Sequence, residues 1–109
     1  MVKKKTASAF VTEVVSLLVE LGDVRAKPMF GGHGLYCGLT FFGLIARDRL
    51  YFKVDDDSRG EYAARGSGPF SPAPGKTMKS YYEVPRDVFE SDEELMRWAR
   101  RAVAVAEVS

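Results

Sequence analysis

The sequence has a single cysteine and a single histidine among its 109 residues. One cysteine excludes an internal disulfide and any zinc site built from several cysteines, and one histidine excludes a histidine-rich metal centre. Net charge is also nearly absent, since 16 Lys and Arg against 15 Asp and Glu leave only +1. That balance gives no indication of a surface built to bind a polyanion.

Long apolar runs are missing as well, and none reaches the roughly 18 residues that indicate a membrane helix. The basic start resembles the head of a signal peptide, but polar residues interrupt the stretch of about 7–15 apolar residues that must follow such a head. We therefore expect a basic N-terminal tail over residues 1–6, no membrane partner and a cytoplasmic setting. Residues 7–109 have the length of one domain.

Apolar spacing in the first half predicts one helix followed by strands. A helical stripe predicts a helix over residues 7–21, capped by Thr6 or Ser8 and ended by Gly22. Residues 24–54 are rich in β-formers and predict a three-stranded antiparallel meander. Its strands are expected over 24–37, 40–46 and 50–54, with turns at Gly38-Leu39 and Asp48-Arg49, and with the middle strand the most buried.

The second half predicts two more helices and two more strands. Ser58 and Glu61 have the spacing of a capping box, which predicts a helix over 58–65, and Ser91 and Glu94 repeat it before a helix over 92–106. Residues 66–76 are rich in Gly and Pro and predict a loop or a poor edge strand, and 77–84 predict a strand. The resulting order, α-β-β-β-α-β-β-α, indicates a two-layer α+β fold with helices packed on an antiparallel sheet.

Two segments resemble metal or nucleotide motifs without completing them. Gly75-Lys76-Thr77 looks like the end of a phosphate-binding loop, but Phe70 occupies the position of the first glycine and a strand is expected after it instead of a helix. We interpret it as a turn between strands. The aspartates at 55–57 resemble the start of a calcium loop, but Arg59 and Gly66 occupy ligand positions. We interpret them as favouring the start of a helix.

His33 and Cys37 are the only residues of the sequence from which a Cys–His nucleophile pair could be built. Four residues of one strand separate them by about 13 Å, too far for a hydrogen bond unless a bulge at Gly34 shortens the strand. We expect Cys37 to behave as a small half-buried hydrophobe. The glycine-rich run 31–34 lacks the context of a dinucleotide site and indicates a place of close backbone approach, to this chain, a second subunit or a ligand.

Aromatic residues lie beside lysines in the two strands expected over 50–54 and 77–84. On an open sheet, such residues stack unpaired bases. The structural alternative, which the small net charge favours, is that alternate aromatics pack under the helices while the tyrosines cover the outer face. The residues concerned are Tyr51, Phe52, Tyr81 and Tyr82 with Lys53 and Lys79.

Several short runs, taken together in order and spacing, resemble the TfoX N-terminal domain family. The resemblance covers about residues 10–106. It rests on Met29-Phe30-Gly31-Gly32, Gly34-Leu35-Tyr36, Phe42-Gly43-Leu44-Ile45 and Leu50-Tyr51-Phe52-Lys53-Val54-Asp55, and on Gly66, Pro69-Phe70, Gly75-Lys76, Tyr81-Tyr82, Pro85, Leu95 and Trp98-Ala99. The family takes its name from a bacterial regulator of natural competence, which has a second, C-terminal domain that these residues do not include.

The resemblance implies a secretion-chaperone-like fold, in which dimers are common, and the family has no established catalytic residues to transfer. We expect no metal, no cofactor and a homodimer. We therefore expect a non-enzymatic regulatory or interaction domain that acts through a protein partner. A weak nucleic-acid-binding module and a small ligand-binding domain or enzyme, built on the glycine-rich strand, stay open as alternatives. The candidate interaction residues are those of the family motif: Met29, Phe30, Gly31, Gly32 and Lys53.

Overall fold

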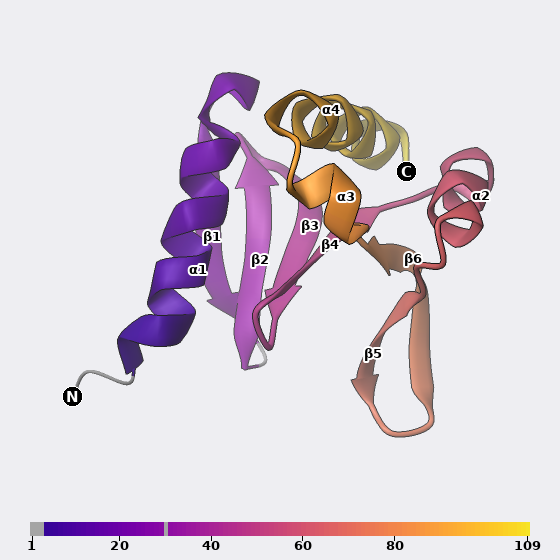
Figure 1. Cartoon of the computed structure of the whole chain (residues 1–109), viewed down its shortest axis with the longest axis horizontal. Coiled ribbons are helices and arrows are strands. Elements are labelled where there is room, and N and C mark those ends of the chain that lie inside the picture. The colour runs from indigo at the N-terminus through magenta and orange to yellow at the C-terminus, as the bar shows by residue number, and fades with distance from the viewer. Residues whose placement is uncertain (1–3, 30) are drawn as a thin grey trace.

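The computed structural model describes residues 4–29 and 31–109, and Figure 1 shows one sheet with the helices packed against it. The sheet has six antiparallel strands in the order β1-β2-β3-β4-β6-β5. The strands are β1 (Val24–Met29), β2 (Gly32–Cys37), β3 (Thr40–Ala46), β4 (Arg49–Lys53), β5 (Pro69–Ala73) and β6 (Lys76–Glu83). The predicted α+β class is confirmed.

The helices are α1 (Lys4–Leu17), α2 (Asp56–Ala64), α3 (Arg86–Phe89) and α4 (Asp92–Val108), with a 3-10 turn, η1 (Val19–Leu21), after α1. No helix among residues 4–29 and 31–109 is long and apolar enough to cross a membrane. The predicted helix over 7–21 was wrong at both ends. It begins at Lys4, within the segment expected as a tail and before the proposed caps Thr6 and Ser8, and its last residues tighten into η1.

The meander over residues 24–54 has four strands where three were predicted. The segment 24–37 is divided by a turn that contains Gly31, whose φ of +79° suits glycine and few other residues. The turn between β2 and β3 lies at Gly38-Leu39, as predicted. The turn between β3 and β4 is centred on Arg47-Asp48, one residue earlier than predicted, and both of these residues have positive φ. Such a pair of positive φ values matches the twist of a tight hairpin.

Helix α2 begins two residues before the predicted start because a different residue caps it. Asp55 accepts a hydrogen bond from the backbone N–H of Ser58 at 2.8 Å, and Ser58 Oγ accepts one from the Asp55 N–H at 3.0 Å. Asp55 is therefore the cap and Ser58 its partner, so the predicted capping box of Ser58 with Glu61 is wrong. This leaves Glu61 free to bind Arg101 on α4.

Helix α4 starts at the predicted residue, with Ser91 Oγ accepting the N–H of Glu94 at 3.3 Å. The second hydrogen bond of the predicted capping box, from the Ser91 backbone N–H to the Glu94 carboxylate, does not form. The Glu94 carboxylate accepts hydrogen bonds from Arg97 and Trp98 instead. Helix α3 was missed, since four residues are too few for a periodic pattern. The Pro-rich segment 66–76 contains β5, an edge strand, and Gly75 makes the predicted turn into β6.

One hydrophobic core lies between the helices and one face of the sheet. Val14 and Leu18 from the first helical segment and Leu95, Trp98 and Ala99 from α4 pack on it. The sheet residues that join this core are Val24, Leu35, Phe42, Ile45, Leu50, Phe52, Val54 and Val84. The described helices that contribute side chains to this core therefore all pack on one face of the sheet. None of them covers the opposite face, which we call the helix-free face (Figure 1).

Candidate interaction surface on the helix-free face

A bulge in β3 decides which aromatic residues reach the helix-free face. Leu35 pairs with Gly43 and Tyr36 pairs with Phe41, so Phe42 is an extra residue in β3. Phe42 enters the helix-side core and is fully buried, whereas Phe41 lies on the opposite face against Tyr36 and Tyr81. A bulge of this kind redirects a side chain without interrupting the sheet.

Three rings form a row across the helix-free face, which we call the aromatic row: Tyr36 on β2, Phe41 on β3 and Tyr81 on β6. Tyr36 and Phe41 are stacked, with centroids 5.1 Å apart and planes inclined by 26°. The Phe41 and Tyr81 centroids are 5.7 Å apart. Tyr81 is only 6% exposed although it does not belong to the helix-side core. The row is thus a small packed layer of its own.

A lysine ammonium lies over each end of the aromatic row. Lys27 Nζ is 5.2 Å from the centroid of Tyr36, and Lys53 Nζ is 5.2 Å from the centroid of Tyr81. Both distances are within the range of a cation–π interaction. Among the described residues, neither ammonium has a carboxylate within 4.0 Å, because the seven ion pairs found there all use arginine.

The motif residues Met29 and Lys53, which are far apart in sequence, lie on this same face. A Cβ placed on Gly34 would come within 2.7 Å of Met29 Sδ and 2.9 Å of Phe41 Cε1. Met29 therefore packs over Gly34 beside the aromatic row, while Lys53 covers the other end. The absence of a side chain at Gly34 is what lets Met29 and Phe41 close over the strand.

The other motif residues support the sheet. A Cβ on Gly32 would lie 2.3 Å from the Ile45 carbonyl oxygen, so the close backbone approach predicted for the glycine-rich run is to β3 of this chain. Gly31 makes the β1–β2 turn. Phe30, also a candidate, lies outside the described residues.

The aromatic residues singled out in the sequence are divided between the two faces. Phe52 and Tyr82 face the helices, where Phe52 is 5.9 Å from Phe42 and Tyr82 is 6.2 Å from Tyr62, measured between centroids. Tyr51 lies on the helix-free face and contacts Phe70 of β5 edge-on at 4.9 Å. The expectation that the tyrosines share the outer face is thus wrong for Tyr82. Tyr36 and Phe41, which sequence reasoning did not select, hold the centre of that face.

Burial changes the acidity of tyrosines on both faces. It raises the pKa of Tyr81 and, together with the nearby Glu83 carboxylate, the pKa of Tyr51. Burial raises the pKa of Tyr62 further still, since this side chain of α2 packs against Trp98 of α4 and Tyr82 of β6. All three phenols are therefore neutral at physiological pH and act as hydrogen-bonding or apolar groups.

His33 and Cys37 stay apart on β2. No residue is inserted in β2 itself, because the bulge lies in β3, so four strand residues separate the two side chains by about 13 Å. Cys37 Sγ instead faces the Leu21 carbonyl oxygen at 3.7 Å and packs against the core, as predicted for a half-buried hydrophobe. No group of three or more His, Cys, Asp or Glu in the described chain is placed to hold a metal ion.

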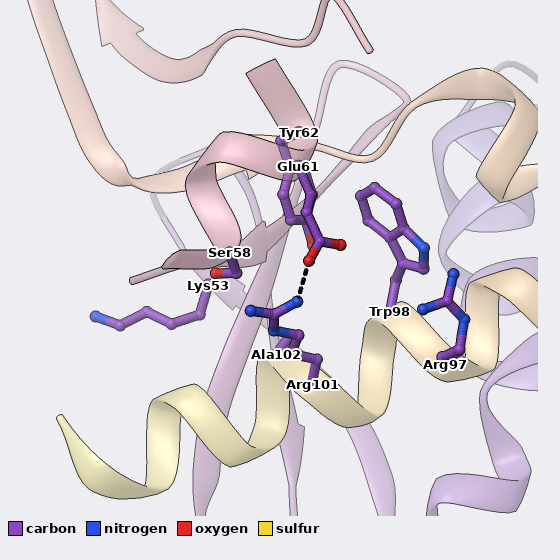
Figure 2. A pocket seen from close by; sticks show the side chains of 8 residues that line it. All are labelled: Lys53, Ser58, Glu61, Tyr62, Arg97, Trp98, Arg101 and Ala102. Carbon is purple, nitrogen blue, oxygen red and sulfur yellow. Dashed lines mark hydrogen bonds and ion pairs between the residues drawn. The ribbon is translucent and has the colours of Figure 1, made fainter. Parts of the chain in front are cut away.

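A cavity of about 100 Å³ lies between α2 and α4 (Figure 2). Three charged residues that line the cavity already form ion pairs. Glu61 pairs with Arg101, and Arg97 pairs with Glu94 at 2.7 Å. The Lys53 side chain extends away from Arg101 and Trp98 in this view (Figure 2). Pockets that bind drug-sized ligands are typically about 300–1,000 Å³, so this cavity is small for such a role.

A second hollow, of about 500 Å³, lies between the end of α2 and α3. Charges of both signs line it and pair with each other: Arg65 with Asp87 at 2.8 Å and Arg86 with Glu90 at 3.4 Å. It therefore presents no concentration of one charge. In the part of the chain that the structure describes, the helix-free face brings together clustered aromatic rings and two lysines without a carboxylate partner.

Comparison with known proteins supports the resemblance drawn from the motifs. The model of the TfoX N-terminal domain matches residues 16–106, which is most of the chain. No curated protein matches the chain. The matched region includes all six strands of the sheet, α2, α3 and α4 up to residue 106. The chain belongs to the TfoX N-terminal domain family.

Proposed function

We propose that this chain is a non-enzymatic regulatory domain, of the kind found in competence regulators, and that it acts by binding a protein partner. The observation that carries the proposal is the helix-free face. It holds the aromatic row, partly exposed apolar side chains beside it, and two lysines whose ammonium groups have no carboxylate partner in the described chain. Membership of the family supports the regulatory part of the proposal.

The chemistry of this face suits binding better than catalysis. Aromatic residues and methionine are enriched in protein interfaces, because they bury a large area at a small cost in side-chain entropy. Tyr36, Phe41 and Met29 are each partly exposed, so a partner would bury further apolar surface there. A nucleophile with an adjacent base, the usual arrangement for covalent catalysis, is not what this surface offers.

We also propose, from the family resemblance, that the protein is a cytoplasmic homodimer. Light scattering coupled to size-exclusion chromatography tests the dimer directly. A mass of about twice 12.1 kDa supports it, and a mass that stays at one chain across the concentration range contradicts it.

The proposal is tested by affinity capture from host lysate, read by mass spectrometry with and without nuclease. The variant is Phe41→Ala, which removes the central ring of the aromatic row. The control is Leu39→Ala, which removes a large apolar side chain that is 95% exposed in the β2–β3 turn. Both variants are compared with the parent after a thermal melt has shown that they are folded.

We expect the parent to capture a specific protein partner whether or not nuclease is added. Leu39→Ala should still capture this partner, and Phe41→Ala should not. If the captured proteins are lost after nuclease treatment, the proposal is contradicted and the nucleic-acid alternative is favoured. Binding to nucleic acid would also weaken steeply with rising salt concentration. Equal capture by the parent and Phe41→Ala shows that the helix-free face is not the binding surface.

A further inference from the structure

The aromatic row and its two lysines make one continuous surface, with a cation over the ring at each end. Successive members, from Lys27 Nζ through the three rings to Lys53 Nζ, are separated by 5.2, 5.1, 5.7 and 5.2 Å. The floor of the surface is apolar and the two ends are positively charged. A ligand that matches it has an apolar middle and a negative charge at each end.

Both cations are available to a ligand. Lys27 is exposed and Lys53 is half-buried, and among the described residues neither has a carboxylate within 4.0 Å. Arg49, on the same strand as Lys53, already binds Glu83 at 3.2 Å. The two lysines thus differ from the seven arginines that form ion pairs in the described chain, because a ring face and no carboxylate lies against each ammonium group. A carboxylate can bind such an ammonium without displacing the ring.

The packing of the rings argues against a nucleic acid in this place. Bases stack on ring faces that are open to solvent, whereas Tyr36 and Phe41 are stacked on each other and Tyr81 is 6% exposed. The net charge of +1 also gives little of the general attraction to phosphates on which nucleic-acid binding depends. Apolar side chains of a polypeptide, in contrast, can lie across a continuous layer of rings.

A second copy of this chain is also a poor match. Two such faces placed together would each bring the same unpaired lysines, and like charges across an interface oppose association. A homodimer of the kind proposed above would therefore use a different surface.

From these observations we propose that the aromatic row binds an extended segment of a partner protein in which acidic residues flank a short apolar stretch. This inference rests on the proposed function and names the chemistry of its partner. An extended chain advances roughly 3.3 Å per residue, so a segment of at most about six residues follows the row from one lysine to the other. The apolar residues would lie on Tyr36 and Phe41, with carboxylates near Lys27 and Lys53.

The test begins with a random peptide library displayed on phage and panned against the full chain. We expect the enriched peptides to carry Asp or Glu on both sides of an apolar stretch. The same library is panned against the double variant Lys27→Glu/Lys53→Glu, for which we expect the flanking preference to change to Lys or Arg. Retention of the acidic preference by the double variant overturns the inference.

The affinity of an enriched peptide is then measured by fluorescence anisotropy. Exposed ion pairs are weak, so Lys27→Gln and Lys53→Gln should each raise Kd by about two- to fivefold, more at low salt than at high salt. Lys76→Gln, which removes an exposed lysine at the start of β6 and away from the row, should leave Kd unchanged. Equal effects of all three variants contradict a role for the row's own cations.

The outcomes separate this inference from the proposed function. If captured protein still depends on Phe41 while the peptides show no acidic flanks, the interaction function stands and the partner chemistry is wrong. If an oligothymidine strand binds the chain and competes with the peptide, the surface belongs to nucleic acid and the inference fails. If Phe41→Ala captures the same partners as the parent, the helix-free face is not the binding surface. The proposed function is then wrong, and this inference is wrong with it.

Discussion

Single glycines determine whether the helix-free face can form. Gly34 lies in β2 below the point where Met29 and Phe41 meet, and Gly32 faces the Ile45 carbonyl oxygen. At both positions a methyl group would need space that another group already occupies. At Gly34 the atoms in the way belong to side chains, which can change rotamer. At Gly32 the atom in the way is a backbone oxygen, which can move only if the strand moves. The two positions therefore differ in what a substitution disturbs.

Gly34→Ala should reduce the free energy of unfolding by about 1–3 kcal/mol, as overpacking of a filled site does, and should weaken partner binding. The added Cβ would lie 2.7 Å from Met29 Sδ and 2.9 Å from Phe41 Cε1, so both must move away from the aromatic row. Urea denaturation measures the loss. Full stability with unchanged binding would show that Met29 and Phe41 do not close over Gly34.

Gly60→Ala provides the matched control, because Gly60 lies inside α2 and a Cβ there would have nothing within 4 Å. Alanine is the better helix former, so the same denaturation experiment should show stabilisation of about 0.5–1 kcal/mol.

The tyrosines predict how the protein behaves in alkali. Burial raises the pKa of Tyr62, and also of Tyr51 and Tyr81, above the value of 10.0 for a free phenol. The folded state therefore favours the neutral phenols, and this stabilisation is complete below pH 10 and is lost as the pH rises toward the folded-state pKa values. The tyrosinate absorbance of these three residues should rise late and together with loss of the far-ultraviolet circular dichroism signal.

Tyr62→Phe removes the most strongly shifted of these phenols and should move alkaline unfolding to higher pH. The parent and the variant are compared by the same absorbance titration. Titration of Tyr51, Tyr62 and Tyr81 near pH 10 with the fold intact would contradict the burial described here.

At the scale of elements, caps and turns explain where the sequence was informative and where it was not. Ser91 was identified as the cap of α4 because an apolar helical stripe follows it at once. Before α2, three aspartates, Ser58 and Glu61 supply several acceptors in succession, and local spacing alone does not select among them. Asp55 serves as the cap because β4 ends two residues before it and its backbone is already extended there.

Asp55→Ala should lower the melting temperature at neutral pH and have little effect in strong acid. Hydrogen bonds from Ser58 hold the pKa of the Asp55 carboxyl below its usual range. The stabilisation is therefore present above the unfolded-state pKa, near 4, and is lost as the pH falls through the lower folded-state value. Asp55→Asn keeps the acceptor and should retain most of the stability with a flatter dependence on pH. An equal loss from Asp55→Ala at both pH extremes would contradict the cap.

Strand β4 shows how one short element serves two layers. Phe52 faces the helices and is fully buried, whereas the next residue, Lys53, faces the aromatic row. Phe52→Ala should cost about 3–5 kcal/mol of the free energy of unfolding. Lys53→Gln should change it by less than about 1 kcal/mol. Chemical denaturation of both variants measures this. A large loss for Lys53→Gln would mean that the lysine belongs to the fold and not to a binding surface.

At the scale of the whole molecule, the face that carries the proposed function depends on contacts between distant parts of the chain. Tyr36 and Phe41 come from adjacent strands, but Tyr81 joins them only because β6, and not β5, pairs with β4. The sequence predicted the α+β class, most of the strands and the position of Lys53. It did not predict the bulge at Phe42, the order of the last two strands or the aromatic row, since each depends on packing between segments remote in sequence.

The most direct test of the account is site-specific photocross-linking in the host cell. A photoreactive phenylalanine analogue replaces Tyr36 on the aromatic row, and in a parallel strain it replaces the exposed Leu39 in the β2–β3 turn. We expect a discrete protein adduct from position 36 that persists after nuclease treatment, and none from position 39. No adduct at position 36, or the same adduct at both positions, would contradict the claim that the helix-free face binds a protein partner.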